Sequence, residues 1–231
     1  MKQKKVLSYL TQSQLKPIVD SYLKKQKACS IIDAFDKLRD IRDIYLRTGD
    51  IDDLRYLLAL CLRCRHGRRM PWTATKRAVD ELLNANILNK SFSNFEQLYA
   101  EIKGLLGNIP FVCGDLTLYD TAVNIGQLLT PIVKPKDFVY LAAGAREGAG
   151  YILGKQNVSS IMPTNAFAVL LPGVSNIDIE NLLCIYKELF KKFAEGKTLT
   201  SQEIEDAYNP HCFFPSPKDI YISRLNNCNI I

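Results

Sequence analysis

The sequence predicts a mainly α-helical globular protein with several helices and room for one short pair of strands. Through most of the first half, apolar residues recur at three- and four-residue steps, which is the spacing of a buried helix face. Residues that favour helix starts precede these runs, and glycines that favour helix ends follow them. The hydrophobic fraction of 47% and the charged fraction of 23% are ordinary for a globular protein.

The clearest helices are expected near residues 31–48 and 51–66. Only Gly49 and Asp50 separate them, so the two helices should pack as an antiparallel hairpin. Gly49 is expected to end the first helix and Asp50 to cap the second. The positions predicted to be buried in this hairpin are Ile41, Leu54, Leu57 and Leu58.

Other helices are expected on either side of this hairpin. Ser13 should cap a helix that runs to Leu23. Further along, Ser93 followed by Glu96 has the spacing of a capping box, in which each residue bonds the backbone N–H of the other. This box should open an amphipathic helix that ends before Gly107.

The second half of the chain is less regular. A helix is expected from Asp115 or Thr117 to Leu129, and residues 138–142 have the composition of a short strand. A glycine-rich turn after a strand can cradle phosphate, but neither the dinucleotide spacing nor the Walker lysine pattern is present. Close packing between helices is therefore the preferred interpretation of Gly144, Gly148 and Gly150.

Towards the end of the chain, shorter elements are expected. Thr164 should cap a short helix to Leu171, and a long helix should follow the next turn and run through Phe193. Thr200 and Glu203 have the spacing of a second capping box, which should start a short helix. The tail is expected to be irregular chain because it contains Pro210, Pro215 and Pro217.

The whole chain, residues 1–231, is interpreted as a single domain with a weak boundary near residue 108. No apolar run approaches the ~20 residues needed to cross a bilayer, and no signal peptide is evident, so no membrane partner is expected. The seven cysteines are odd in number and irregular in spacing, which favours free thiols in a reducing compartment. A cytoplasmic location is therefore expected.

Basic residues cluster between Leu62 and Val79, a stretch without an acidic residue, in a chain of formal net charge +6. The stretch should turn at residues 70–72 and enter a helix at Thr73 or Thr75. Arginine donates paired hydrogen bonds to phosphate, and tryptophan can stack on a base or an arginine. The alternative is a solvated helix end whose cations complement the helix dipole. The nucleic-acid-binding residues predicted here are Arg63, Arg65, Arg68, Arg69, Trp72, Lys76 and Arg77.

A second motif runs from Leu171 through Pro172, Gly173 and Val174 to Ser175. It resembles the hairpin of helix-hairpin-helix DNA-binding proteins, which reads Leu-Pro-Gly-Val-Gly, so Ser175 departs from the family pattern. In that family the hairpin amides hold a DNA phosphate, which implies phosphate contacts at Gly173 and Ser175. Unpaired N–H groups and the dipole at a helix start both favour an anion. The alternative is a simple turn in which Ser175 caps the next helix.

A helical chain with such a hairpin is also similar to the helix-hairpin-helix DNA glycosylases. Those enzymes carry a catalytic aspartate about one helix beyond the hairpin, and some carry a lysine within it. Here the expected helix ends in residues 191–196 without a matching aspartate, and the hairpin contains no lysine. The resemblance therefore assigns no catalytic residue to this chain.

Two further groups of residues are interpreted as structural. Cys61 and Cys64 lie three apart on an apolar helix face with His66 nearby, whereas His211 and Cys212 are distant in sequence. Zinc needs four converging ligands, so no metal and no cofactor are expected. Polar residues inside an apolar helix are expected to be buried hydrogen-bonding groups, with site residues as the alternative, and these are Tyr119 and Asp120.

The leading hypothesis from sequence is a helical protein that binds DNA or RNA mainly through phosphate contacts. An adaptor or assembly subunit that binds another protein without catalysis is the first alternative. An enzyme of the DNA glycosylase type is the second. Salt separates the first two hypotheses, because affinity for nucleic acid falls steeply with ionic strength and an apolar protein interface does not respond in this way.

Overall fold

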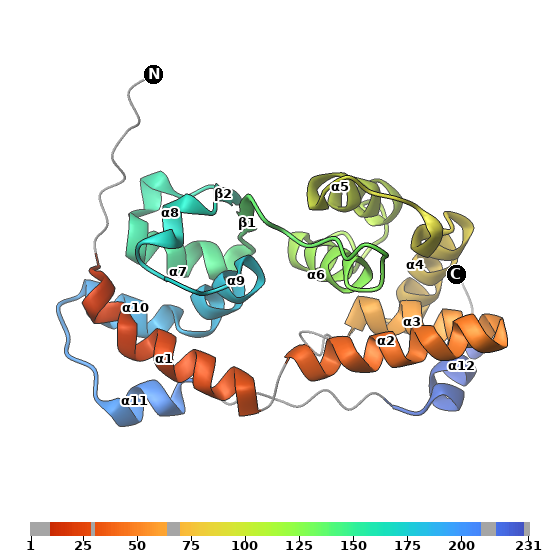
Figure 1. Ribbon diagram of the computed structural model, residues 1–231, viewed down its shortest axis with the longest axis horizontal. Coiled ribbons are helices and arrows are strands. Elements are labelled where there is room, and N and C mark those ends of the chain that lie inside the picture. Colours follow the sequence, from red (N-terminus) through yellow and green to blue (C-terminus); the bar gives the residue numbers. More distant parts are fainter. Residues whose placement is uncertain (1–9, 29–30, 64–69, 209–215, 229–231) are drawn as a thin grey trace, which may run out of the picture. The chain divides into compact units, whose positions relative to one another are not determined.

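The computed structural model describes residues 10–28, 31–63, 70–208 and 216–228. The fold is mainly α-helical with one short strand pair, as the sequence predicts (Figure 1). The chain divides into two compact units, and each unit is built from two separate stretches of sequence. No change of unit falls near residue 108, and the expectation of a single domain stays a prediction.

Unit 1 comprises Met1–Cys29 and Pro135–His211. Its described elements are α1 (Gln12–Ala28), β1 (Phe138–Tyr140), α7 (Ala143–Leu153), η2 (Lys155–Asn157), β2 (Ile161–Pro163), α8 (Asn165–Ala168), α9 (Asn176–Ile185), α10 (Lys187–Ala194) and α11 (Ser201–Asp206). The strands pair antiparallel, with Val139 opposite Met162. A Cβ added to Gly148 of α7 would lie 2.1 Å from the carbonyl oxygen of Leu183 in α9, so close helix packing is what this glycine allows.

Unit 2 comprises Ser30–Lys134 and Cys212–Ile231. Its described elements are α2 (Ile31–Thr48), α3 (Ile51–Arg63), α4 (Trp72–Asn84), η1 (Ile87–Asn89), α5 (Phe95–Leu106), α6 (Asp115–Gly126) and α12 (Lys218–Asn227). Helix α3 is the centre of the unit, because α2, α4, α6 and α12 all pack against it. This surrounding explains why residues 56–62 are buried without interruption.

The helical hairpin predicted from Gly49 and Asp50 is present, and α2 and α3 pack against each other. Asp50 caps α3, because its carboxylate accepts a hydrogen bond from the Asp52 amide at 2.9 Å. The burial prediction holds for Leu57 and Leu58 and is wrong in part for the other two residues. Ile41 and Leu54 are only half-buried, and Leu54 lies on the wall of an open pocket.

Two predicted caps are wrong in position. Helix α1 begins at Gln12 rather than after Ser13, and the amide of Thr11 donates to the Gln14 side chain at 2.9 Å. Helix α5 is capped by Asn94, whose side chain accepts from the Gln97 amide at 2.9 Å. The Gln97 side chain accepts from the amide of Ser93, so the N-cap lies one residue after the predicted Ser93 and the two bonds do not form a capping box.

Helix lengths differ from the predictions in the second half. The expected long helix after residue 175 breaks at Tyr186, where φ is −95° and ψ is 12°, and continues as α10. The Tyr186 side chain is fully buried between the rings of Tyr22 and Tyr208, which fixes the backbone at this point. Helix α6 ends at Gly126 and not at Leu129. The capping box at Thr200 is confirmed.

The prediction of an irregular tail is wrong for residues 218–227, which form helix α12, whereas Pro210 and Pro215 lie outside the described residues. Pro217 stands at its N-cap position, where a missing N–H costs nothing. Lys218 binds the start of α3 through the carboxylates of Asp50 at 2.5 Å and Asp53 at 2.6 Å. Within the described stretches, no helix is both long and apolar enough to cross a membrane.

Candidate nucleic-acid interface

The predicted nucleic-acid-binding residues fall into three groups in the structure. Arg63, Trp72, Lys76 and Arg77 belong to unit 2, at the end of α3 and the start of α4. Gly173 and Ser175 belong to unit 1, at the turn before α9. Arg65, Arg68 and Arg69 lie outside the described residues. The structure therefore brings Arg63 and Trp72 together within one unit.

Arg63 is the last residue of α3, and its guanidinium connects this helix to the start of α4. Nη1 donates to the carbonyl of Met70 at 3.2 Å and to the hydroxyl of Thr75 at 3.0 Å. The Thr75 hydroxyl donates in turn to the carbonyl of Pro71 at 3.1 Å. The guanidinium carbon lies 4.3 Å from the centre of the Trp72 ring, within the range of a cation–π contact. Helix α4 begins at Trp72, so the prediction that it begins at Thr73 or Thr75 is wrong by at least one residue.

Helix α12 adds two side chains that the sequence analysis missed. The Arg224 guanidinium lies 5.4 Å from the centre of the Trp72 ring, and Tyr221 meets that ring edge-on at 5.1 Å. Arg224 is exposed, whereas Tyr221 is buried. The signal that predicts this helix is a proline start at Pro217 followed by apolar residues at helical spacing, Tyr221 and Leu225. We call this group the tryptophan cluster, and its residues are Arg63, Trp72, Tyr221 and Arg224.

The tryptophan cluster contains two arginines, Arg63 and Arg224, and no acidic side chain. Among the described residues, no carboxylate forms an ion pair with Arg63, Arg77 or Arg224. Burial lowers the pKa of the Arg63 guanidinium, and the charge of Arg224 lowers it further. A guanidinium is not deprotonated in proteins at neutral pH, so Arg63 keeps its positive charge. Lys76 differs from these residues, since it pairs with Asp80 at 2.6 Å.

The turn before α9 is followed by an acidic residue, Asp178, in the first turn of that helix. Gly173 has φ of +75°, which glycine adopts easily. The Ser175 hydroxyl accepts from the Asp178 amide at 3.2 Å, so the capping alternative is present. The Asp178 carboxylate lies in the first turn of α9 and accepts a hydrogen bond from the Tyr22 hydroxyl at 3.0 Å. A carboxylate in this place repels a phosphate and satisfies the helix dipole itself.

The other candidate residues have structural surroundings. Cys61 is fully buried, and its carbonyl accepts a hydrogen bond from the side chain of Asn124 at 2.7 Å. Tyr119 and Asp120 are buried in α6, and the Tyr119 ring packs edge-on against Phe95 at 5.9 Å. In the part of the chain that the structure describes, no three metal-ligating side chains converge. The four remaining metal candidates lie outside that part: Cys64, His66, His211 and Cys212.

No protein-family model, curated protein or solved structure matches the chain at a significant level. Function is therefore inferred from the side chains of the chain itself. The tryptophan cluster joins two cations that have no carboxylate partner among the described residues to the chain's single tryptophan. These features give it the composition of a site for an anion.

Proposed function

We propose that the chain binds nucleic acid at the tryptophan cluster, mainly through contacts to the phosphate backbone. The observation that supports this proposal is the pair of guanidiniums beside one indole ring, Arg63 at 4.3 Å and Arg224 at 5.4 Å. Two like charges held close together repel each other, and a bound phosphate would relieve that repulsion. A purely structural role explains Arg63, because its guanidinium donates hydrogen bonds to Met70 and Thr75 at the start of α4. It does not explain the exposed side chain of Arg224.

The sequence that follows Arg63 contains further basic residues. Arg65, Arg68 and Arg69 follow Arg63 directly in sequence and precede Met70, and no acidic residue interrupts them. Arg77 is exposed on α4, one turn beyond the start of that helix. A run of this kind attracts any polyanion over distances of about 10 Å at moderate salt. The proposal therefore expects affinity for many sequences rather than recognition of one.

Phosphate contacts explain the geometry better than base stacking does. The Arg63 guanidinium already lies over the Trp72 ring and is held there by its bonds to Met70 and Thr75. A base that stacked on this face of the indole would have to displace a bonded arginine. The proposal leaves out the hairpin at Gly173 because the Asp178 carboxylate stands at the start of α9.

Titration with labelled duplex DNA, single-stranded DNA and RNA at low salt tests the proposal. Binding should weaken steeply as salt rises, because each duplex phosphate contact contributes about 0.9 to the slope of log affinity against log salt. Arg224→Ala should reduce that slope by about 1 for unrelated duplex sequences. Arg47→Ala is the matched control, since Arg47 is an exposed arginine on α2 outside the cluster.

The chain's single tryptophan reports where binding occurs. Trp72 is the only tryptophan in the sequence, so a change in tryptophan emission on titration arises at the cluster. Binding with a slope that is unaltered by Arg224→Ala and by Arg68→Ala with Arg69→Ala would place the site elsewhere on the chain. Absence of binding to any of these nucleic acids at low salt would remove the proposal, and the protein-adaptor hypothesis would take its place.

A further inference from the structure

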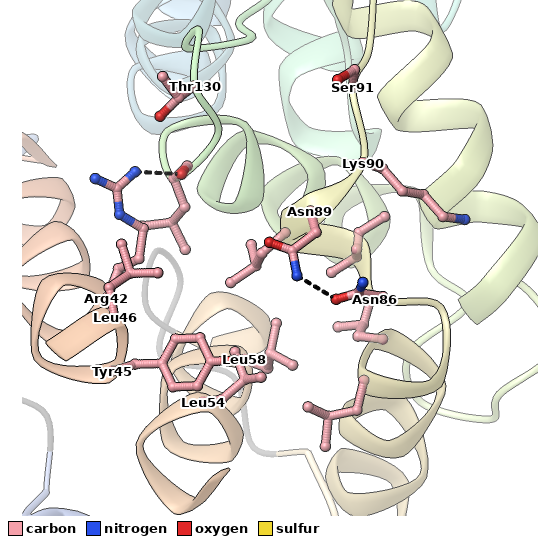
Figure 2. Close-up of a pocket in the computed structure, with 15 residues that line it drawn as sticks. Arg42, Tyr45, Leu46, Leu54, Leu58, Asn86, Asn89, Lys90, Ser91 and Thr130 are labelled. Atoms are coloured by element: carbon pink, nitrogen blue, oxygen red, sulfur yellow. Dashed lines mark hydrogen bonds between the residues drawn. The ribbon is translucent and has the colours of Figure 1, made fainter. Parts of the chain in front are cut away.

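A pocket of about 280 Å³ opens in unit 2 among α2, α3, α4, η1 and the segment after α6 (Figure 2). The buried part of its lining is aliphatic and includes Leu58, Leu82 and Leu128, which are almost completely buried. Its exposed part is polar and includes Asn86, Asn89, Ser91 and Thr130. Leu54 and Leu83 form half-buried walls. A space of this size lies just below the range of ~300–1,000 Å³ that small-molecule sites occupy. The pocket therefore fits one slender apolar group and not a large ring system.

The charged residues that line the pocket are both cations, Arg42 and Lys90. Lys90 is already used, because its ammonium pairs with Glu101 of α5 and points away from the pocket in Figure 2. Arg42 is held at the rim, where Nη1 donates to the Leu128 carbonyl at 2.6 Å. No carboxylate lines the pocket in the described part of unit 2, so Arg42 is the charged group at the rim that a ligand anion can reach.

Arg42 keeps hydrogen-bonding capacity for a ligand. Its Nε and Nη2 both donate to one oxygen of Asp43, at 3.2 and 3.1 Å, and a guanidinium has five N–H donors in total. The Asp43 side chain is 56% exposed, and exposed pairs of this kind contribute little. A ligand carboxylate that meets the planar guanidinium can form a bidentate pair, which is stronger and more directional.

We propose that this pocket binds a small amphipathic anion, an unbranched aliphatic chain with a carboxylate at one end. The aliphatic chain lies among the leucines of α3 and α4, and the carboxylate binds Arg42 at the rim. The asymmetry of the pocket carries the assignment. Its buried side chains are aliphatic, and its polar rim holds Arg42, whose exposed partner Asp43 a ligand carboxylate would replace. None of its lining residues belongs to the tryptophan cluster, so this proposal does not depend on nucleic-acid binding.

The first test is calorimetric titration of the intact protein with hexanoate, octanoate, decanoate and dodecanoate below their micellar concentrations. Affinity should rise about fourfold for each added methylene, which is the fold-change that burial of one CH₂ produces. The rise should stop when the chain fills the pocket. No saturable binding, or affinities that do not depend on chain length, would overturn the proposal.

The second test separates the two ends of the ligand. Arg42→Gln should weaken decanoate at least tenfold, because the carboxylate loses its partner, and should leave decanol within twofold of the wild-type affinity. Arg47→Gln is the matched control, since Arg47 lies on the same helix but does not line the pocket, and it should change neither ligand. An equal loss of decanoate and decanol in Arg42→Gln would contradict the assignment of the rim.

The third test fills the pocket. Leu54→Trp places a larger side chain from the half-buried wall into the open space, and it should abolish binding of both ligands. Ile44→Trp is the control, because Ile44 is exposed on α2 and does not line the pocket. If Leu54→Trp does not fold, Leu83→Phe occupies the same space from α4. A folded variant that binds decanoate as tightly as wild type would place the ligand elsewhere and end the proposal.

Discussion

Trp72 takes its electrostatic surroundings from two arginines that reach it from different parts of the sequence. Arg63 ends α3 and lies over the ring, and Arg224 comes from α12. The face of an indole is the most favourable aromatic surface for a cation, so each contact holds a charge in place. The ring is therefore surrounded by positive potential while remaining partly accessible to solvent.

This arrangement predicts unequal quenching of tryptophan fluorescence by ions of opposite charge. Iodide should quench Trp72 more efficiently than caesium at equal ionic strength, because the arginines concentrate anions around the ring. Arg224→Ala should bring the two quenching constants closer together, whereas Arg47→Ala should not. Quenching by caesium that equals or exceeds quenching by iodide in the wild type would show that the arginines do not set the local potential.

Asn124 makes a buried hydrogen bond whose loss should be measurable. Its side chain is fully buried in α6, and it donates to the carbonyl of Cys61 at 2.7 Å near the end of α3. Asn124→Ala removes this buried hydrogen bond, so unfolding in urea should be easier by roughly 1–3 kcal/mol. Asn84→Ala, at an exposed position on α4, is the control and should change stability by less than about 0.5 kcal/mol. Equal stability of the two variants would contradict this role.

At the level of single elements, local sequence signals predicted some helices well and others badly. The hairpin at Gly49 and the capping box at Thr200 depend on residues within a few positions of each other, and both are confirmed. The break at Tyr186 depends on a ring buried between side chains from distant segments, which periodicity within one helix does not reveal. The prolines of the tail led to a prediction of irregular chain and not of α12. A proline can end one element, but it also favours the start of a helix, as Pro217 does here.

The capping box of α11 should make unit 1 sensitive to acid. Hydrogen bonds from Lys192 and from the backbone of Thr200 lower the pKa of Glu203 to about 2. The ionised form is the bound form, so its stabilising contribution is complete above the ordinary value near 4.5 and is lost as pH falls towards about 2. Glu203→Gln should therefore melt at a lower temperature than wild type at neutral pH, and the difference should shrink in acid.

Thermal melts between neutral pH and about pH 2 measure this difference, since that interval spans the shifted pKa of Glu203. Glu188→Gln is the control, because Glu188 is an exposed carboxylate of the same unit at the start of α10. A melting difference for Glu203→Gln that stays constant across this range would show that ionisation of Glu203 does not hold α11.

The contact between α7 and α9 gives a second test at the level of elements. Gly148→Ala would push a methyl group to 2.1 Å from the Leu183 carbonyl, so the helices must separate. Overpacking of this kind costs about 1–3 kcal/mol. Gly104→Ala in α5 meets nothing within 4 Å and should be neutral or stabilising, because alanine has the higher helix propensity. Urea unfolding of both variants decides whether the two glycines differ in this way.

At the level of the whole molecule, the division into two units could not be predicted from the sequence. Helix α1 packs against α11 in unit 1, and α12 packs against α3 and α4 in unit 2, although these partners are far apart along the chain. Local patterns indicate which segments form helices but not which distant segments pair. The same holds for the candidate site. Arg63 and Trp72 are close in sequence and could be predicted together, whereas Arg224 is far away in sequence and could not.

The interleaving of the two units has a consequence for a broken chain. The chain changes unit between residues 29 and 30, 134 and 135, and 211 and 212. A protease that cut the backbone once, at the Lys134–Pro135 junction, would produce two fragments that each hold part of both units. The fragments could then separate only if both hydrophobic cores unfolded. The nicked protein should therefore elute as one species in size-exclusion chromatography, and the two fragments should separate only in denaturant.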